Sequence, residues 1–153
     1  MHLEIYCDGG CRGNQHDTNV GGWGAYLVWG EHTRELFGGE LNTTNNKMEL
    51  TAAIEGLRAV KNKDVETHVF VDSSYVLGGI TDWIAGWKQK GWVNSKKQPV
   101  ANKELWMELD KLRQQFAHIE FHKVKGHSDN VGNNKADELA NRGMDEVEAN
   151  NSR

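Results

Sequence analysis

The stretch Leu3-Glu4-Ile5-Tyr6-Cys7-Asp8-Gly9-Gly10 opens the chain with a strand pattern that runs into a carboxylate and two glycines. Apolar and polar residues alternate along it, which is the period of a strand with one face in a core. A second β-rich run, Val69-Phe70-Val71-Asp72, also ends in an aspartate. Because ligand sites in α/β sheets gather at strand ends, the two runs predict a site at one edge of a sheet.

Strand and helix patterns alternate along the rest of the chain. Further strands are expected at 24–30, 33–37 and 119–124, with a hairpin-like Gly30-Glu31-His32 between the first two. Helices are expected where apolar residues recur at helical spacing, at 50–57, 74–80, 82–88, 102–116 and 133–143. This order predicts a single α/β domain over residues 1–153, with a mixed sheet and helices on both faces. The polar tail from about 145 to 153 is expected to be disordered.

Composition narrows the class of protein. A chain of 153 residues can bury a core without a disulfide or a structural metal. Its 2 cysteines, Cys7 and Cys11, are too few for a disulfide framework and lack a zinc-binding spacing, so reduced thiols are expected. No targeting leader and no apolar run of membrane length are found. We therefore expect a monomeric cytoplasmic protein without a membrane segment.

Charge is distributed unevenly. The net charge of −4 argues against a general nucleic-acid binder, but residues 82–103 contain five lysines and one acid, a local balance of +4 that leaves −8 for the remainder. An acidic body with a basic projection suits a metal-centred nuclease, in which acids hold cations and lysines contact phosphates.

Four acidic residues stand in settings that could hold a divalent cation: Asp8, Glu49, Asp72 and Asp137. Hard cations such as Mg2+ prefer oxygen ligands. Each residue also has an ordinary structural explanation, as a turn former, a helix cap or a charge near a helix N-terminus. If the strand ends and helix starts converge, however, the carboxylates would repel each other strongly without cations. Such a cluster would therefore be a metal site.

Five blocks occur in an order that marks a family: Asp8-Gly9-Gly10-Cys11-Arg12-Gly13-Asn14, Thr44-Asn45-Asn46-Lys47-Met48-Glu49-Leu50, Asp72-Ser73-Ser74-Tyr75-Val76, Lys125-Gly126-His127-Ser128 and Ala136-Asp137-Glu138-Leu139-Ala140. Together they resemble bacterial-type ribonuclease HI over roughly Leu3 to Met144. The resemblance implies the ribonuclease H fold, in which helices flank both faces of a five-stranded mixed sheet.

The resemblance also implies an activity, namely hydrolysis of the RNA strand of RNA–DNA hybrids to give 5′-phosphate and 3′-hydroxyl ends. Two Mg2+ ions, for which Mn2+ is a possible substitute, would act on the scissile phosphate. Asp8 would bridge both ions, Glu49 and Asp72 would complete one site, and Asp137 the other. His127 matches a mobile histidine that assists proton transfer or product release, although a loop histidine can also be plain surface.

The resemblance assigns substrate contacts to small polar residues beside the acids. Contacts with 2′-hydroxyl groups across the minor groove are expected from Cys11, Asn14, Asn45, Asn46 and Ser74. Thr44 and Asn102 match positions that bind a DNA phosphate. Ser74 stands where a longer amide is common and Asn42 where a basic residue is frequent, so some contacts are expected to be altered.

The basic segment at about 82–103 is similar to the protrusion with which this family grips the DNA strand. Its expected contacts are Trp87, Lys88, Lys90, Trp92, Lys96 and Lys97. Tryptophans at helical spacing commonly pack inside a protein instead, and we expect Trp83 and Trp106 to be mostly structural.

Alternative interpretations remain. A non-catalytic hybrid-binding module and an integrase- or transposase-like DNA nuclease core could share the fold. His118, Glu120 and His122 could face one side of a strand as zinc ligands, although the intervening Ile119 and Phe121 favour an ordinary half-exposed strand.

Overall fold

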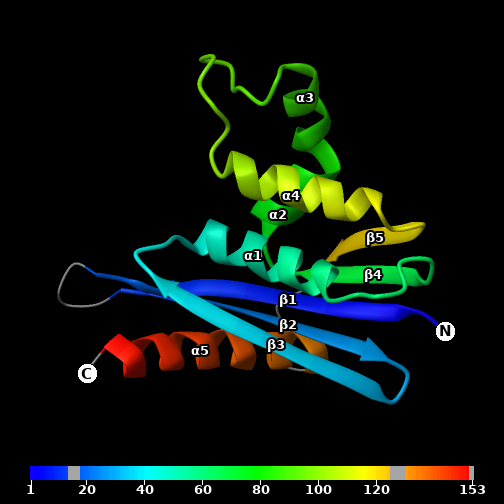
Figure 1. The fold of residues 1–153 in the computed structure, drawn as a ribbon, viewed down its shortest axis with the longest axis vertical. Coiled ribbons are helices and arrows are strands. Elements are labelled where there is room, and N and C mark those ends of the chain that lie inside the picture. Colours follow the sequence, from blue (N-terminus) through cyan, green and yellow to red (C-terminus); the bar gives the residue numbers. More distant parts are fainter. Residues whose placement is uncertain (14–17, 125–129, 152–153) are drawn as a thin grey trace.

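The protein is described by a computed structural model, which covers residues 1–13, 18–124 and 130–151. A five-stranded sheet lies at its centre (Figure 1). The strands are β1 (Leu3–Arg12), β2 (Val20–Trp29), β3 (His32–Leu41), β4 (Glu66–Val71) and β5 (His118–Lys123). Their order is β3-β2-β1-β4-β5, antiparallel from β3 to β1 and parallel from β1 to β5. This confirms the mixed sheet.

Helices cover both faces of the sheet. On one face lies α1 (Asn45–Arg58), which packs on β1 and β2 and is covered in turn by α4 (Lys103–Gln114). On the other face α5 (Val131–Asn151) packs on β1, β2 and β3 (Figure 1). The arrangement confirms the expected fold. Among the described residues, no helix has the length and apolar character needed to cross a membrane.

The core follows the sequence periods. The apolar side of β1 is buried, with Ile5 fully inaccessible, and its polar side chains remain partly exposed. The helical stripe of α1, which includes Leu50 and Leu57, lies against it. Burial of such a side chain stabilises the fold by about 1.5–3 kcal/mol, so this interface anchors α1 on the central strand.

A continuous helical run connects β4 with the basic segment. It consists of α2 (Ser74–Gly78), a π-helical stretch η1 (Gly79–Trp83) and α3 (Ile84–Gln89). The sequence predicted two separate helices here, whereas the π-helical stretch joins them. In Figure 1, α3 and the loop after it stand away from the sheet, at the end of the molecule opposite α5.

The predicted disorder of the tail from about residue 145 is wrong, because α5 continues to Asn151. Met144 is buried, and Arg12 donates to Asp145 at 2.8 Å and also to Glu148. These contacts join the helix to the end of β1. The partner of the tail lies more than a hundred residues away in the chain, so no local pattern predicts it.

Helix α5 lies unusually close to the backbone of β2. A Cβ atom at Gly24 would sit 2.4 Å from the carbonyl oxygen of Ala136 and 2.6 Å from the Cβ of Leu139. Neither neighbour is the flexible end of a side chain. Only a glycine therefore allows α5 to approach β2 as it does.

We expect Gly24→Ala to lower the free energy of unfolding by about 1–3 kcal/mol, because the added methyl group must displace the backbone of α5. Urea denaturation measures the change. Gly86→Ala is the matched control, since a Cβ at Gly86 in α3 meets nothing within 4 Å. It should leave the stability unchanged or raise it by up to about 1 kcal/mol through helix propensity. Equal stability of the two variants would contradict the close approach.

Candidate active site

Asp8 and Asp72 lie next to each other on neighbouring parallel strands. Cys7 of β1 is paired with Val71 of β4, and the two aspartates are the next residues along each chain segment. Asp72 directly follows the end of β4, as predicted. Asp8 does not end its strand, because β1 stays paired with β2 as far as Arg12. The two carboxylates nevertheless meet at one point of the sheet.

Glu49 reaches this point from α1. The helix begins after Thr44, whose side chain accepts a hydrogen bond from the Lys47 backbone N–H at 3.1 Å. A Cβ at Gly9 would lie 2.5 Å from the backbone nitrogen of Glu49, so only glycine lets the first turns of α1 touch β1. The Glu49 carboxylate accepts a hydrogen bond from Ser73, the residue after Asp72.

Asp137 reaches Asp8 from α5, on the opposite face of the sheet. It lies in the second turn of α5, which begins at Val131, rather than at the opening of a helix. Its carboxyl group is in hydrogen-bonding contact with that of Asp8. The structure thus brings all four predicted carboxylates into one network, in which Asp8 interacts with Asp137 and Asp72, and Asp72 with Glu49.

The network is electrostatically strained. Burial raises the pKa of Asp8 to about 8, and contact with Asp137 and the charge of Asp72 add to the effect. Burial also raises the pKa of Glu49, reinforced by Asp72 and opposed by the hydrogen bond from Ser73. Either a proton or a cation relieves such repulsion. An all-oxygen donor set with this deficit of positive charge fits a hard divalent cation such as Mg2+.

Small polar residues surround the carboxylates. Cys11 lies near the end of β1. At the start of α1, the N-cap Thr44 and the first two helical residues, Asn45 and Asn46, are exposed. The side-chain oxygen of Asn45 would be 3.8 Å from a Cβ at Gly10, so it lies over the strand that carries Asp8.

Ser74 opens α2, and its hydroxyl accepts a hydrogen bond from Lys123 Nζ at 2.6 Å. Neither Lys123 nor Ser73 was singled out from the sequence, because Lys123 of β5 contacts Ser74 of α2 and Ser73 contacts Glu49 of α1, both distant in the chain. The only available signal was the position of Ser73 directly after Asp72. The predicted residues Asn14 and His127 lie outside the described part of the chain.

In the basic segment the tryptophans pack against each other. Trp87 lies with its ring centroid 6.0 Å from Trp83, 6.4 Å from Trp92 and 5.4 Å from Trp106. Trp106 is fully buried, as expected, whereas Trp83 is 43% exposed and only partly structural. Trp87 and Trp92 are both partly buried, so each contributes to packing and is still partly accessible to solvent.

The lysines of this segment differ in their surroundings. Lys88 pairs with the buried carboxylate of Asp110 at 3.1 Å, which weakens its prediction as a phosphate contact. Lys90, Lys96 and Lys97 are exposed. Lys96 and Lys97 belong to a turn held by the Asn94 side chain, which accepts hydrogen bonds from the backbone N–H groups of Lys96 and Gln98 at 2.9 and 3.1 Å.

Asn102 joins the basic segment to the helices beneath it. Its side chain donates to the Tyr75 hydroxyl at 3.2 Å, which also accepts from Trp106 at 3.0 Å. Asn102 has a positive φ of 58°, a conformation that asparagine tolerates. Its side chain is therefore engaged in the fold as well as available at the surface, being only partly buried.

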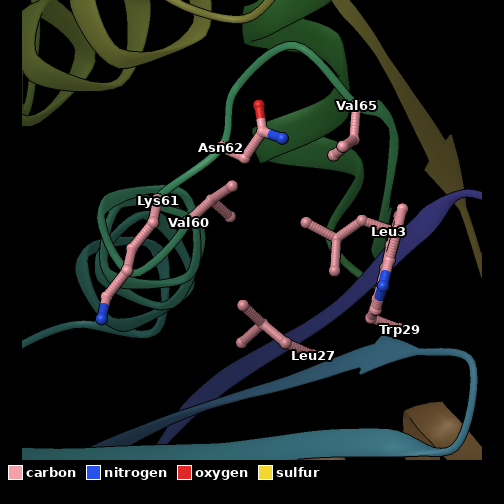
Figure 2. A pocket seen from close by; sticks show the side chains of 7 residues that line it. All are labelled: Leu3, Leu27, Trp29, Val60, Lys61, Asn62 and Val65. Carbon is pink, nitrogen blue, oxygen red and sulfur yellow. The ribbon is translucent and has the colours of Figure 1, made fainter.

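A pocket of about 320 Å³ lies elsewhere, where β1 begins and β2 ends. Figure 2 shows its lining, which is Leu3, Leu27, Trp29, Val60, Lys61, Asn62 and Val65. It contains no carboxylate and lies at the opposite end of β1 from Asp8 and Gly9. Its apolar walls offer no set of converging catalytic groups, so the carboxylate network remains the candidate site.

Comparisons with a family model and with named proteins point to one family. The family model described as RNase H matches residues 1–145. A protein named Ribonuclease H from Cupriavidus necator is 52% identical over 147 residues, which cover 96% of this chain and 98% of that protein. A Ribonuclease H from Coxiella burnetii is also 52% identical, over 94% of this chain and 90% of its own.

Solved structures agree with the fold. The N-terminal RNase H domain of Rv2228c from Mycobacterium tuberculosis is 29% identical with a TM-score of 0.69, covering 97% of each chain. LC9-RNase H1, a type 1 RNase H with the type 2 active-site motif, is 27% identical with a TM-score of 0.77, over 95% of this chain and 72% of its own.

The raised pKa of Asp8 predicts a pH-dependent stability in metal-free buffer. The folded protein retains a proton that the unfolded chain releases near pH 3.8, so this group makes the free energy of unfolding fall as pH rises from about 4 to about 8. Asp8→Asn should remove the effect and be more stable than the wild type at pH 8. Because the site is partly open to solvent, we expect a difference of about 1–2 kcal/mol.

Urea denaturation in EDTA at several pH values measures the free energy of unfolding of the wild type and of Asp8→Asn. Subtracting one value from the other cancels the contributions of the remaining titrating groups. The difference should shrink as pH falls toward 4 and vanish below that value, where the unfolded chain also binds the proton. A difference that stays constant across this range would show that the pKa of Asp8 is not raised in the folded protein.

Proposed function

The chain belongs to the ribonuclease H family, and we propose that it hydrolyses the RNA strand of RNA–DNA hybrids at the carboxylate network. The observation that carries the proposal is the convergence of Asp8, Glu49, Asp72 and Asp137 from four separate elements. The relatives named Ribonuclease H, about half identical to this chain over nearly their whole length, support the same activity. Among the solved structures of this fold, LC11-RNase H1 is in complex with an RNA/DNA hybrid.

We propose that the four carboxylates hold two Mg2+ ions, for which Mn2+ can substitute. The donors fit, since all are carboxylate oxygens, and burial together with the neighbouring Asp137 and Asp72 raises the pKa of Asp8. When bound, the metal ions supply a nucleophilic water and stabilise the charge on the leaving oxygen. Asp8 alone among these acids interacts with both Asp137 and Asp72, so it would contribute to holding both ions.

The protein's own groups orient the substrate. Asn45 and Asn46 on the exposed first turn of α1, with Cys11 and Ser74 beside them, can hydrogen-bond 2′-hydroxyl groups across a minor groove without reading bases. Thr44 and Asn102 are proposed contacts of a DNA phosphate. The hydrogen bond from Ser73 holds Glu49 in place. Asn14 as a substrate contact and His127 as a proton-transfer group remain predictions.

The basic segment is the proposed contact with the DNA strand. Lys90, Lys96 and Lys97 are exposed and can contact phosphates, while Trp87 or Trp92 would offer a flat ring face to a sugar. Lys88 is a weaker candidate because its charge already neutralises Asp110.

We also propose that the protein is a monomeric single domain that acts in the cytoplasm. Its two cysteines are free thiols, as expected in a reducing compartment.

The experiment that tests the function is cleavage of an end-labelled RNA–DNA hybrid, with double-stranded RNA and DNA as competing substrates, in Mg2+ and in EDTA. We expect metal-dependent cutting of the hybrid's RNA strand alone. Binding without cutting would favour a hybrid-binding module, and cutting of DNA would favour an integrase-like nuclease.

Asp8→Asn and Asp72→Asn should each abolish cleavage, by about 10³-fold or more, because each removes a charge needed to hold the cations. Affinity for the hybrid, measured by a mobility shift, should change little. Glu31→Gln is the matched control, since Glu31 is an exposed acid in the β2–β3 turn, and it should cleave normally. Cleavage retained by either aspartate variant would refute the site.

Lys90→Ala and Lys96→Ala should each weaken hybrid binding several-fold and reduce the slope of log affinity against log salt by about 1, because each removes one phosphate contact. Filter binding at several salt concentrations measures both quantities. Lys61→Ala, an exposed lysine beside the apolar pocket, is the matched control. If all three variants behave alike, the basic segment does not contact the substrate.

A further inference from the structure

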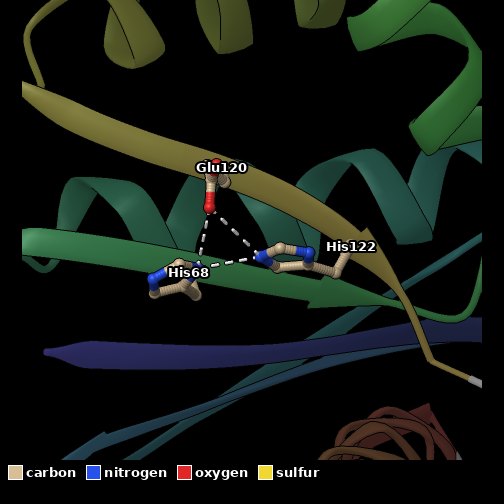
Figure 3. Close-up of side chains that lie close together, drawn as sticks. All are labelled: His68, Glu120 and His122. Carbon is tan, nitrogen blue, oxygen red and sulfur yellow. Dashed lines mark hydrogen bonds and ion pairs between the residues drawn. The ribbon is translucent and has the colours of Figure 1, made fainter.

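A second group of metal-ligand side chains lies on β4 and β5, away from the carboxylate network. His68 Nδ1 is 2.8 Å from His122 Nε2 and 3.4 Å from Glu120 Oε2, and His122 Nε2 is 3.9 Å from the same carboxylate oxygen (Figure 3). Among the described residues, this is the one set of three or more histidine, cysteine or acidic side chains whose ligand atoms all lie within 4.8 Å of each other.

Strand register creates the group. In the parallel pair β4–β5, His68 lies opposite Glu120 and Phe70 opposite His122. Residues two apart on a strand share a face, so all three ligand side chains project from the same face of the sheet. The face is accessible, because the side chains of His68, His122 and Glu120 are 18%, 39% and 67% exposed.

The sequence suggested a different trio on one strand, with His118 as its third member. In the structure, the third member of the group is His68 and not His118. His68 lies on the neighbouring strand β4, fifty residues before His118 in the chain. The prediction of an ordinary half-exposed strand is correct for β5, since Ile119 and Phe121 pack against the core. It does not account for the three ligand atoms that converge on its outer face.

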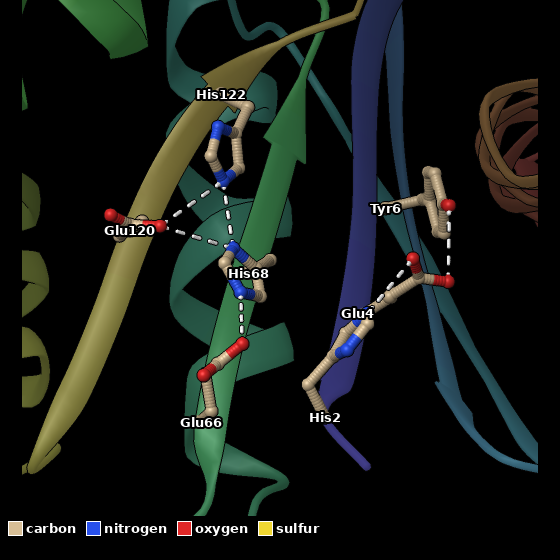
Figure 4. Close-up of polar contacts among 7 residues, drawn as sticks. All are labelled: His2, Glu4, Tyr6, Glu66, His68, Glu120 and His122. Carbon is tan, nitrogen blue, oxygen red and sulfur yellow. Dashed lines mark hydrogen bonds and ion pairs between the residues drawn. The ribbon is translucent and has the colours of Figure 1, made fainter.

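His68 is held in the orientation that a metal ligand requires. Its second ring nitrogen, Nε2, lies 2.8 Å from Glu66 Oε2 (Figure 4). If Nε2 donates its hydrogen to this carboxylate, Nδ1 carries the lone pair that faces His122 and Glu120. A carboxylate bound to the far nitrogen is the usual way in which proteins orient a metal-ligating histidine.

Stacked rings also fix the position of His122. Its ring centroid lies 5.0 Å from that of His68 and 5.1 Å from that of Phe70, with interplanar angles of 24° and 27°. Phe70 stacks in turn on Tyr6 of β1, at 4.8 Å. The two imidazoles are therefore supported by neighbouring side chains rather than free in solvent.

We propose that His68, His122 and Glu120 form a binding site for a late first-row divalent cation, of which Zn2+ is the representative. Ligands at about 2.1 Å in a tetrahedron lie about 3.3–3.4 Å apart. The separations of 3.4 and 3.9 Å already approach this value, and the two imidazoles need to part by about half an ångström. The fourth position is left to water.

The site is distinct from the carboxylate network in its place and in its chemistry. His68 precedes Asp72 by four residues on β4, which is about 13 Å along a strand. Imidazole ligands favour Zn2+ and other late transition metals, whereas an all-carboxylate set favours Mg2+. A cation here joins β5, the edge strand, to β4, so binding stabilises the folded state.

The test is a calorimetric titration of the whole protein with Zn2+ at about pH 7.5, because metal binding requires a neutral imidazole. Excess Mg2+ is present to compete for oxygen ligands. We expect one Zn2+ to bind the wild type, His122→Gln to lower the affinity by about 100-fold or more, and Glu66→Gln to lower it by about 10- to 100-fold. Thermal unfolding should show a Zn2+-dependent increase in the wild type that His122→Gln loses.

His32→Gln is the matched control, since His32 is exposed at the start of β3, and it should bind Zn2+ as the wild type does. Circular dichroism without metal verifies that each variant is folded. Equal binding by the wild type and His122→Gln would place the cation elsewhere and overturn the proposal, as would the absence of Zn2+ binding by the wild type. Hybrid cleavage in Mg2+ should be unaffected by His122→Gln, so the outcome is independent of the proposed function.

Discussion

Two helices lie directly on the backbone of the central strands, and the geometry of the carboxylate network depends on these close contacts. Gly9 admits the first turns of α1, and Gly24 admits the middle of α5. With a side chain at either position, Glu49 or Asp137 would move away from Asp8. The buried apolar interface of α1 with β1 supplies free energy that keeps α1 there.

That free energy offsets the mutual repulsion of the acids. Asp8 lies beside Asp137 and Asp72, and burial, reinforced by these two neighbours, raises its pKa. If the site binds divalent cations as proposed, their charge would relieve this repulsion. The histidine group on β4 and β5 is built differently, since hydrogen bonding and ring stacking hold its two imidazoles together. One sheet thus carries two donor sets with opposite metal preferences.

The basic segment combines packing with charge. Its tryptophans form a connected cluster around Trp87, and this cluster holds α3 against the buried Trp106 of α4. Lys90 directly follows α3, and Lys96 and Lys97 lie in the turn held by the Asn94 side chain. If these lysines bind a nucleic acid as proposed, this ordered support would reduce the conformational entropy lost on binding.

Local patterns in the sequence determined much of this protein. Strand alternation identified the buried side of β1, helical spacing identified the stripe of α1, and the setting of each acid identified the four carboxylates. Only the tertiary structure decided the rest. It decided that β1 continues past Asp8 by pairing with β2, that Arg12 orders the end of α5, that Asp110 engages Lys88, and that His68 joins Glu120 and His122. Each of these depends on a partner distant in the chain, because periodicity encodes which face of an element is buried but not which residue will lie opposite it.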